Sequence, residues 1–597
     1  MDTSAPEPGK TERLGSAWLG TIPHDDPWYH GTADSLDRAF NAYLGRLTAN
    51  ISPASLWLAY CDWIIHLQLS PSKQHQLLLE AWRKYWQWQS LHAHSFLHLE
   101  DVHRQRVEPL PQDKRFAGEG WNQWPFDVFS QGFLLTQQWW HRATTGVVGV
   151  SRHHEQVVTF VARQLLDTLS PSNYLPTNPD AIQETVRSNG ANVVRGAVKE
   201  WKDIEALMTG IPHSFADDLC VGKSLGITPG KVIYRNRLIE LIQYTPTTSA
   251  VHARPVLFVP AWIMKYYILD LSPENSLVRY LVNQGYTVFM ISWKNPGVKD
   301  RDLSMEDYRQ LGIMAAIDAI TGVTGCDKLN AVGYCLGGTL LSIAAATMAR
   351  DGDERLSSIS LFAAQVDFTE PGELSLFIDE SQIAQLEASM WDQGFLDTKQ
   401  MAGAFQLLRS NDLIWSRRLN QYILGQPERR NDLAAWNADA TRMPYRMHSE
   451  YLRRLFLGND FAEGRYRVHG RTIAITDIRV PIFAVGTLTD HVAPWRSVFK
   501  IHLLADTEVT FLLTSGGHNA GVVSPPGQPK RSYQVARHRH DDAYIDPDTW
   551  EAMVPTTDGS WWPAWELWLK ASSGESVRPP PMGKALCSAP GTYVMVT

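Results

Sequence analysis

Cysteine is scarce in this sequence of 597 residues, which holds only five. They are scattered as Cys61, Cys220, Cys326, Cys335 and Cys587, without a Cys-x-x-Cys pair. An odd number of isolated cysteines argues against a disulfide framework and against a zinc site of the usual ligand spacing. We therefore expect a protein of the reducing cytoplasm without a metal site.

Long apolar runs and an excess of positive charge are also missing. No uninterrupted apolar run reaches bilayer length, and the first ten residues lack the apolar stretch of a signal peptide. Lysine and arginine number 55 against 63 acidic residues, so the formal net charge is -8, and the two signs are interspersed. The sequence thus predicts neither a transmembrane segment nor a nucleic-acid partner.

Tryptophan, by contrast, is abundant, with 23 residues, and the first third of the chain has helical spacing. Residues 1–30 are rich in Pro, Gly and polar residues, which predicts a flexible tail. Over residues 31–215 apolar side chains recur at helical intervals, as in Leu56, Tyr60 and Ile64. We expect a mostly helical N-terminal domain there, without catalytic motifs.

A different pattern covers residues 216–597. A predicted hairpin turns at residues 235–237, and short apolar runs then alternate with helical stretches, which is typical of an α/β fold with a mostly parallel, doubly covered sheet. The predicted strands are residues 256–259, 287–291, 329–332, 359–362, 482–485 and 509–513. Helical spacing over about residues 372–478 interrupts them. Such an insertion usually covers the carboxyl ends of the strands, so we expect a cap over a ligand site.

The run Gly333-Tyr334-Cys335-Leu336-Gly337 follows one of these strands and precedes a helical stretch. Its glycines allow a sharp turn that lifts the central side chain above the sheet, which is the shape of a nucleophile elbow. Most such elbows carry serine, and a thiol in that place favours acyl exchange with thioesters. Taken alone the motif is weak, because most cysteines are small buried hydrophobic residues.

Two later strands are followed by candidate partners for Cys335. Asp490 comes after strand 482–485, and His518 lies in a glycine-rich loop after strand 509–513. The order nucleophile, acid, base is that of the α/β-hydrolase fold. His491 is a competing candidate beside Asp490. We predict that His518 takes the proton of Cys335, while Asp490 orients His518 and stabilises the imidazolium.

Backbone N–H groups near the elbow are candidates for an oxyanion hole. We expect Leu336 to supply one, and the loop after strand 256–259, near Trp262 or Ile263, to supply the other. The helix N-terminus after Cys335 also favours negative charge on the sulfur.

The sequence around these residues resembles the polyhydroxyalkanoate synthases, the bacterial polyester polymerases. The resemblance runs from about Arg115 to Leu569. The length and the elbow sequence are most similar to class I, which prefers short monomers. The matching motifs are residues 261–271, 333–338, 411–415, 436–439, 489–495, 515–521 and 559–563.

The resemblance implies an acyltransferase that polymerises (R)-3-hydroxyacyl-CoA, such as 3-hydroxybutyryl-CoA, and releases CoA. It implies Cys335 as acyl carrier, no cofactor, and attachment to polyhydroxyalkanoate granules in the cytoplasm, and we expect a homodimer. Arg409 matches a family position near bound CoA, where a guanidinium can pair with phosphate. Trp415 and Trp436 are candidates for the substrate path. The alternatives are a surface ion pair for Arg409 and a core role for both tryptophans.

Two features depart from the family pattern. Asn519 stands where an apolar residue is common, and residues 537–540 match no family feature, so we expect a solvated loop rather than a metal site there. The predicted triad alone also allows a thioesterase or a polyester depolymerase of the same fold. The cysteine and the cap motifs argue against these. A non-catalytic granule-associated protein is a further alternative, and an intact triad argues against it.

Overall fold

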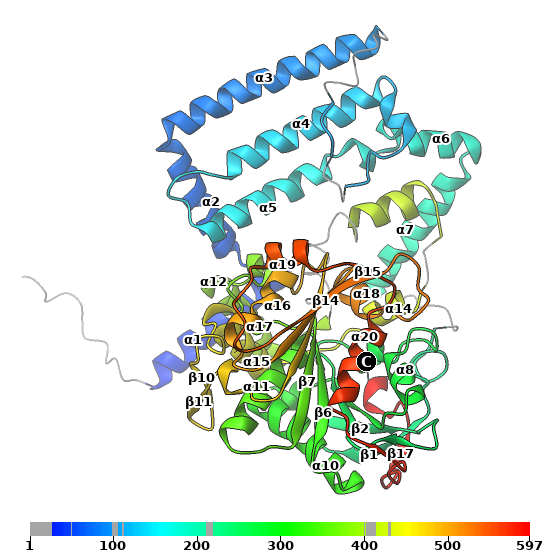
Figure 1. The fold of residues 1–597 in the computed structure, drawn as a ribbon. Helices are drawn as coiled ribbons and strands as arrows, with labels where there is room; N and C mark the ends of the chain where they lie inside the picture. Colours follow the sequence, from blue (N-terminus) through cyan, green and yellow to red (C-terminus); the bar gives the residue numbers. More distant parts are fainter. Residues whose placement is uncertain are drawn as a thin grey trace, which may run out of the picture.

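A computed structural model describes residues 27–48, 50–97, 106–109, 113–209, 219–398, 400, 414–427 and 431–596. Most of the predicted tail, residues 1–26, lies outside these ranges. In Figure 1 most of a helical N-terminal segment lies above a unit built around a large sheet, whereas the first helix of the segment lies beside that unit. Across the described ranges, no helix combines the length and the apolar character needed to cross a bilayer.

The N-terminal segment is mostly helical, as predicted. Its helices are α1 (Pro27–Leu47), α2 (Pro53–Gln68), α3 (Pro71–Phe96), α4 (Phe126–Thr144), α5 (Arg152–Thr168), α6 (Pro179–Arg187) and α7 (Ala191–Thr209). Proline starts α2 and α6, where a missing N–H costs nothing, and Ser52 and Asn178 cap them with side-chain oxygens. Helix α2 packs on α5 and α3 packs on α4 (Figure 1).

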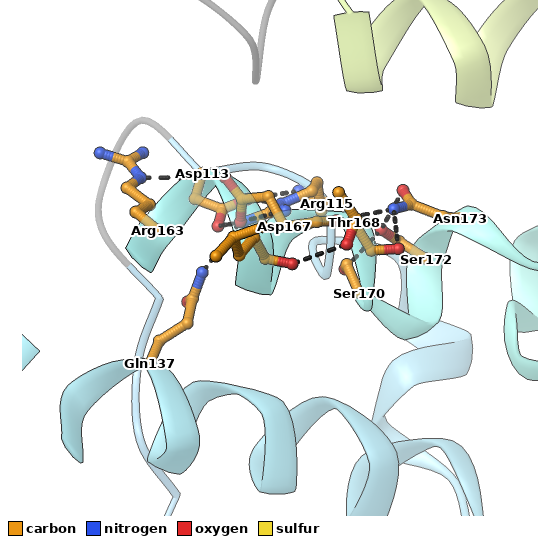
Figure 2. Close-up of polar contacts among 10 residues, drawn as sticks. Asp113, Arg115, Gln137, Arg163, Asp167, Thr168, Ser170, Ser172 and Asn173 are labelled. Carbon is orange, nitrogen blue, oxygen red and sulfur yellow. Dashed lines mark hydrogen bonds and ion pairs between the residues drawn. The ribbon is translucent and has the colours of Figure 1, made fainter. Parts of the chain in front are cut away.

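A buried ion-pair cluster fixes part of this segment (Figure 2). The Arg115 guanidinium donates to both carboxylate oxygens of Asp113, at 2.9 and 2.7 Å, and to Oδ1 of Asp167 at 2.9 Å. Gln137 of α4 donates to the same Asp167 oxygen at 3.0 Å. Because buried charges are tolerated only with close partners, the cluster holds α4, α5 and the chain before α4 in one arrangement.

The rest of the chain is organised around a sheet that has eleven strands within the described residues, in the order β15-β14-β13-β12-β7-β6-β4-β5-β2-β1-β17. The six strands from β13 to β5 are parallel, and the strands on both flanks pair antiparallel. The strands are β1 (Gly230–Arg235), β2 (Ile239–Tyr244), β4 (Val256–Val259), β5 (Val288–Trp293), β6 (Leu329–Tyr334), β7 (Leu356–Phe362), β12 (Ile482–Thr487), β13 (Val509–Thr514), β14 (Ser532–His538), β15 (Thr557–Asp558) and β17 (Cys587–Ser588).

Every strand expected from an apolar run is present, but the flanking strands β14, β15 and β17 were not predicted. Arg537 and His538, expected in a solvated loop, form the end of β14 and pair with β13. That expectation was wrong for these two residues, because a polar strand beside a buried neighbour leaves no apolar run in the sequence.

Helices cover both faces of the sheet. Leu257 and Val259 of β4 pack with α10 (Ala315–Thr324) and α11 (Leu336–Arg350). Val256 and Phe258 point the other way and pack with α8 (Leu277–Asn283) and α20 (Trp562–Ala571). Alternate residues along the strand thus belong to two hydrophobic cores, one on each face of the sheet. The expected α/β-hydrolase architecture is confirmed.

The chain between β7 and β12 forms the predicted insertion. It contains α12 (Glu380–Gln393), α14 (Asp432–Ala438) and α15 (Tyr445–Tyr451). It also contains two small antiparallel pairs that helical spacing did not indicate, β8 (Phe395–Leu396) with β9 (Met443–Pro444), and β10 (Tyr466–Val468) with β11 (Arg471–Ile473).

The N-terminal segment contacts this insertion directly. Helix α1 lies along α12 (Figure 1). Gln382 of α12 donates to the carbonyl oxygen of Asn50 at 2.6 Å and accepts from the N–H of Ser52 at 2.7 Å. The N-terminal helices and the insertion are therefore joined by buried hydrogen bonds.

Asp379, which caps α12, makes this contact dependent on pH. It accepts a hydrogen bond from Ser55 and pairs with His153 at 3.4 Å. Burial raises the pKa of Asp379, but His153, Ser55 and a backbone N–H outweigh it and lower the pKa from 3.8 to about 2. A carboxylate with a lowered folded-state pKa stabilises the fold above its unfolded pKa, and this contribution is lost as the pH falls through the folded pKa.

We expect Asp379→Asn to lower the free energy of unfolding by about 2 kcal/mol at neutral pH. The difference from wild type should shrink as the pH falls from 3.8 towards about 2. Denaturant unfolding followed by tryptophan fluorescence measures it. Asp392→Asn is the matched control, because Asp392 forms an exposed ion pair with Arg46 and should contribute little. Equal losses of unfolding free energy in Asp379→Asn and Asp392→Asn would contradict the stabilising role given to Asp379.

Candidate active site

Cys335 occupies the turn between β6 and α11, at the carboxyl ends of the parallel strands. Its φ of 52° and ψ of -126° lie where glycine is favoured, so the conformation costs about 1–3 kcal/mol. Its backbone N–H donates to the carbonyl oxygen of Phe362 on the neighbouring strand at 2.9 Å. A Cβ on Gly337 would lie 2.1 Å from the carbonyl oxygen of Val259. The turn therefore needs glycine beside Cys335 and holds the cysteine in a strained conformation.

Asp490 and His518 come from loops at the same edge of the sheet, after β12 and at the start of α18 (His518–Val522). Nδ1 of His518 lies 2.8 Å from Oδ2 of Asp490. Asp490 also accepts from the Thr487 hydroxyl at 2.7 Å and from the N–H groups of Val492 and Ala493 at 2.8 and 2.9 Å. Both carboxylate oxygens are thus hydrogen-bonded, which fixes the group that orients His518.

The electrostatics of the site favour a protonated His518. Burial lowers the pKa of His518, but Asp490 and Cys335 more than compensate, and the pKa lies well above its ordinary value. A hydrogen bond between His518 and Cys335 contributes to this increase. Burial raises the pKa of Asp490, whereas His518 and the hydrogen bonds bring it below its ordinary value. The three groups form one connected unit that can hold a thiolate beside an imidazolium.

His491, the competing candidate, lies elsewhere. Its side chain is exposed, and Nδ1 faces Glu373 at 4.0 Å. The structure brings His518, and not His491, to the Asp490 carboxylate.

A largely apolar cavity of about 370 Å³ opens onto Cys335. Ile263 and Leu336 line it, so both residues predicted to supply oxyanion N–H groups lie at its wall, whereas Trp262 is buried in the core. The insertion and the N-terminal segment complete the wall with Phe368, Phe377, Leu386, Met443, Leu452, Phe456, Asn50 and Ile51. A concave apolar site of this size is typical of small-molecule binding.

The residues predicted along the substrate path differ in placement. Trp436 is buried, and its indole N–H donates to the carbonyl oxygen of Lys265 at 2.8 Å, which favours the core alternative. Trp415 follows Ile414, which lines the cavity. Arg409 lies outside the described residues.

Asn519, the departure noted in the sequence, links three parts of the site. Its side-chain oxygen accepts from the Tyr334 hydroxyl at 2.5 Å, and its amide donates to Asn437 at 3.3 Å. An apolar side chain could make neither bond. Asn519 thus connects the elbow, the helix that carries His518 and the insertion.

Two tryptophans support the helix that begins with His518. The indole N–H groups of Trp561 and Trp562 donate to the carbonyl oxygens of Gly521 and Val522, at 2.9 and 3.0 Å. The tryptophans are visible in the sequence, but their role depends on pairing across about forty residues, which no local pattern signals.

Because Trp561→Phe keeps an aromatic side chain but removes the indole N–H donor, we expect it to lower kcat about tenfold with KM little changed. The Gly521 carbonyl would lose its partner and α18 its fixed position. Steady-state turnover of the 3-hydroxyacyl-CoA substrate that the resemblance implies measures both constants. Trp568→Phe on α20, the helix that Trp561 precedes, is the control, since Trp568 packs against Phe483. A fall in kcat of the same size in the control would contradict the role.

Comparisons with known proteins identify the class and then the family. A model of the alpha/beta hydrolase fold matches residues 254–520. The model described as Poly-beta-hydroxybutyrate polymerase (PhaC) N-terminus matches residues 112–281, and that described as Poly-beta-hydroxybutyrate polymerase N terminal matches residues 31–73. The chain is therefore a protein of the α/β-hydrolase fold. Its N-terminal region matches the models of the N-terminal part of poly-beta-hydroxybutyrate polymerases.

Sequence identity to relatives places the chain within one family. It is 43% identical over 500 residues to the poly(3-hydroxyalkanoate) polymerase of Methylorubrum extorquens, covering 82% of this chain and 81% of the relative. It is 35% identical over 498 residues to the Cupriavidus necator poly(3-hydroxyalkanoate) polymerase subunit PhaC, covering 81% and 83%. Among solved structures, the Paleococcus ferrophilus monoacylglycerol lipase matches 56% of this chain and 99% of its own, at 13% identity and a TM-score of 0.32. The chain belongs to the poly(3-hydroxyalkanoate) polymerase family and is an acyltransferase.

Proposed function

We propose that this chain polymerises (R)-3-hydroxyacyl-CoA and that Cys335 carries the growing polyester as a thioester. The observation that supports this mechanism is the connected unit of Cys335, His518 and Asp490 at the wall of an apolar cavity. Membership of the polymerase family supports the polymerisation reaction. The geometry of the site supports the roles proposed for Cys335, His518 and Asp490.

The first step loads the cysteine. The Cys335 thiolate attacks the thioester carbonyl of the substrate, and the backbone N–H groups of Leu336 and Ile263 stabilise the oxyanion. A carbon–sulfur bond to Cys335 forms, the bond to the CoA sulfur breaks, and the departing CoA takes the proton held by His518. One thioester replaces another, so the step is close to energy-neutral.

The second step lengthens the chain. The 3-hydroxyl of the next monomer attacks the Cys335 thioester, His518 accepts its proton, and Cys335 leaves as thiolate. The chain is now an ester on the CoA of that monomer. It returns to Cys335 by the first step, which releases CoA. Forming an oxygen ester from a thioester is downhill, and an apolar cavity limits competition from water.

Incubation of the purified full chain with 3-hydroxybutyryl-CoA tests the proposal. Polymer should form together with CoA. CoA with free 3-hydroxybutyrate alone would favour a thioesterase or depolymerase. Parallel reactions with C4, C6 and C10 substrates test the proposed preference for short monomers, and C4 should be fastest.

Granule attachment is proposed for the helical N-terminal segment, because α2 and α3 expose large aromatic side chains. Trp82 and Trp86 are 62% and 54% exposed, with ring centres 5.7 Å apart. Trp57, Tyr60 and Tyr85 are exposed on the same two helices. Aromatic rings with a polar tip suit a surface between apolar polymer and water.

We expect the double variant Trp82→Gln/Trp86→Gln to lower the granule-bound fraction about tenfold, because two large apolar contacts are lost. Co-sedimentation with polymer granules measures the fraction. Trp201→Gln on α7, where Trp201 is 70% exposed, is the matched control. Unchanged sedimentation of the double variant would exclude this surface as the attachment site.

The remaining expectations are also proposals. These are a homodimer, a cytoplasmic location, CoA contact at Arg409, and a division into domains 31–215 and 216–597. Sedimentation equilibrium tests the dimer, fluorescence microscopy of the tagged chain tests the location, and CoA binding by Arg409→Ala tests the contact.

A further inference from the structure

The largely apolar wall of the cavity holds a few buried polar side chains, and three of them, His448, Gln365 and Asn50, carry an atom without a hydrogen-bond partner among the described residues. On Asn50 that atom is the acceptor Oδ1, whereas on His448 and Gln365 it is a nitrogen. His448 of α15 is 4% exposed and Gln365 is 6% exposed, and both line the cavity. Nδ1 of His448 and Nε2 of Gln365 have no hydrogen-bond partner among the described residues. A buried polar atom without a hydrogen-bond partner lowers the stability of the fold by about 1–3 kcal/mol. Native proteins contain few such atoms, and each calls for an explanation.

Gln365 reaches the cavity from the sheet side. It lies three residues after Phe362, whose carbonyl oxygen accepts the N–H of Cys335 at 2.9 Å. The backbone carbonyl of Gln365 accepts the hydroxyl of Thr339 on α11 at 2.8 Å. The backbone of Gln365 is therefore fixed to the helix that starts at the elbow, and its amide remains available to a ligand.

His448 reaches the cavity from the insertion. Its ring stacks with that of Tyr451, with centres 6.3 Å apart. Tyr451 also lines the cavity, and burial, with a smaller contribution from Cys335, raises its pKa well above the ordinary value. Tyr451 thus connects His448 to the neighbourhood of the cysteine.

The chemistry of the two groups limits what they can bind. Burial lowers the pKa of His448 to about 4, so the ring is neutral near pH 7 and can donate or accept one hydrogen bond at Nδ1. Gln365 can donate through its amide. No Lys, Arg, Asp or Glu is among the described residues that line the cavity. The pair suits a neutral oxygen rather than a phosphate or a carboxylate.

An acyl group on Cys335 carries such an oxygen. Its thioester carbonyl faces the N–H groups proposed for the oxyanion, so the next polar atom along the chain is the oxygen on carbon 3. In an apolar cavity that oxygen needs a hydrogen-bonding partner to offset its desolvation.

We propose that His448 and Gln365 bind the carbon-3 oxygen of the acyl group on Cys335 and so select 3-hydroxyacyl over unsubstituted acyl substrates. This inference rests on the proposed function. It assigns no proton transfer to His448, which serves as a binding residue beside the base His518. When the chain grows, the same oxygen becomes an ester oxygen, which both groups can still bind by donation.

Rapid-quench measurement of the first CoA released tests this, with 3-hydroxybutyryl-CoA and butyryl-CoA compared on the full chain. Butyryl-CoA can load Cys335 but has no hydroxyl. Wild type should prefer the hydroxylated substrate. His448→Leu and Gln365→Leu should each lower that preference about tenfold, with butyryl-CoA loading kept within about twofold.

The butyryl-CoA rate serves as the internal measure of folding, because a damaged fold lowers both rates together. His448→Asn, which restores a donor near the Nδ1 position, should recover part of the preference. Gln385→Leu on α12 is the matched control: Gln385 is buried, is not among the described residues that line the cavity, and donates its amide to the carbonyl oxygen of Asn41. It should leave the ratio unchanged.

An unchanged ratio in both leucine variants, or equal losses with both substrates, overturns the inference. Failure of the proposed function has a different signature. In that case Cys335→Ala would still release CoA, or wild type would make no polymer.

Discussion

Replacement of Cys335 by alanine is expected to lower CoA release by about a thousandfold or more, because the acyl group loses its carrier. The side chain is small and nearly buried, so the fold should persist. Intact-mass spectrometry after brief exposure to 3-hydroxybutyryl-CoA should show an acyl adduct on wild type and none on Cys335→Ala. An adduct of the same mass on the alanine variant would place the acyl chain on another residue.

Cys335→Ser is the informative companion, since it keeps a nucleophilic atom at the same position. Serine would hold the chain as an oxygen ester, and transfer to the next hydroxyl would then exchange one ester for another. The transfer step itself would no longer be downhill, because the drop from thioester to oxygen ester would already occur when serine is loaded. We expect slow loading, an accumulated acyl adduct and little polymer. Polymerisation near the wild-type rate would mean that sulfur is not required.

Asp490→Asn should have the second largest effect, a loss of about a hundredfold to ten-thousandfold in kcat. The asparagine amide can present an N–H where Oδ2 now faces Nδ1 of His518, which disfavours the required tautomer. Loss of the carboxylate also removes a main cause of the raised pKa of His518.

The imidazolium that accompanies the thiolate is therefore less stable in Asp490→Asn. The residual activity of Asp490→Asn, relative to that of wild type, should rise with pH. The reason is that the Cys335 thiol must then lose its proton without a stabilised His518 imidazolium beside it. A pH series of kcat/KM measures this. His491→Gln, on the same loop but exposed, is the control and should behave as wild type. A comparable loss there would shift the base assignment to His491.

The central sheet could be predicted from the sequence because its strands are buried on both faces. Strand β4, for example, has the predicted bounds Val256–Val259, and continuous apolar runs of this kind signal a covered parallel strand. The flanking strand β14 has no fully buried residue, and polar side chains interrupt its few apolar ones. The two residues of β17 are defined only by their pairing with β1. Such strands depend on partners that lie far away in the chain.

At the active site, too, some residues are indicated by the local sequence, whereas others are brought into place only by tertiary packing. The order of Cys335, Asp490 and His518 after three strands is a property of the chain, so it could be predicted. His448 lies on a seven-residue helix of the insertion, and only tertiary packing brings it to the cavity. The indole bonds of Trp561 and Trp562 likewise require the folded arrangement.

The wall that Asn50 and Ile51 contribute to the cavity constrains any exchange of parts between relatives. A chimera that joins the N-terminal helices of one polymerase to the catalytic sheet of another would bring together mismatched surfaces at residues 50–55 and 379–385. Since Gln382 and Asp379 bind Asn50, Ser52 and Ser55, both stretches need to come from the same parent. The modular unit for engineering is thus the whole chain from α1 onward, and a transplanted catalytic domain without its own α1–α2 connection should be left with an incomplete pocket.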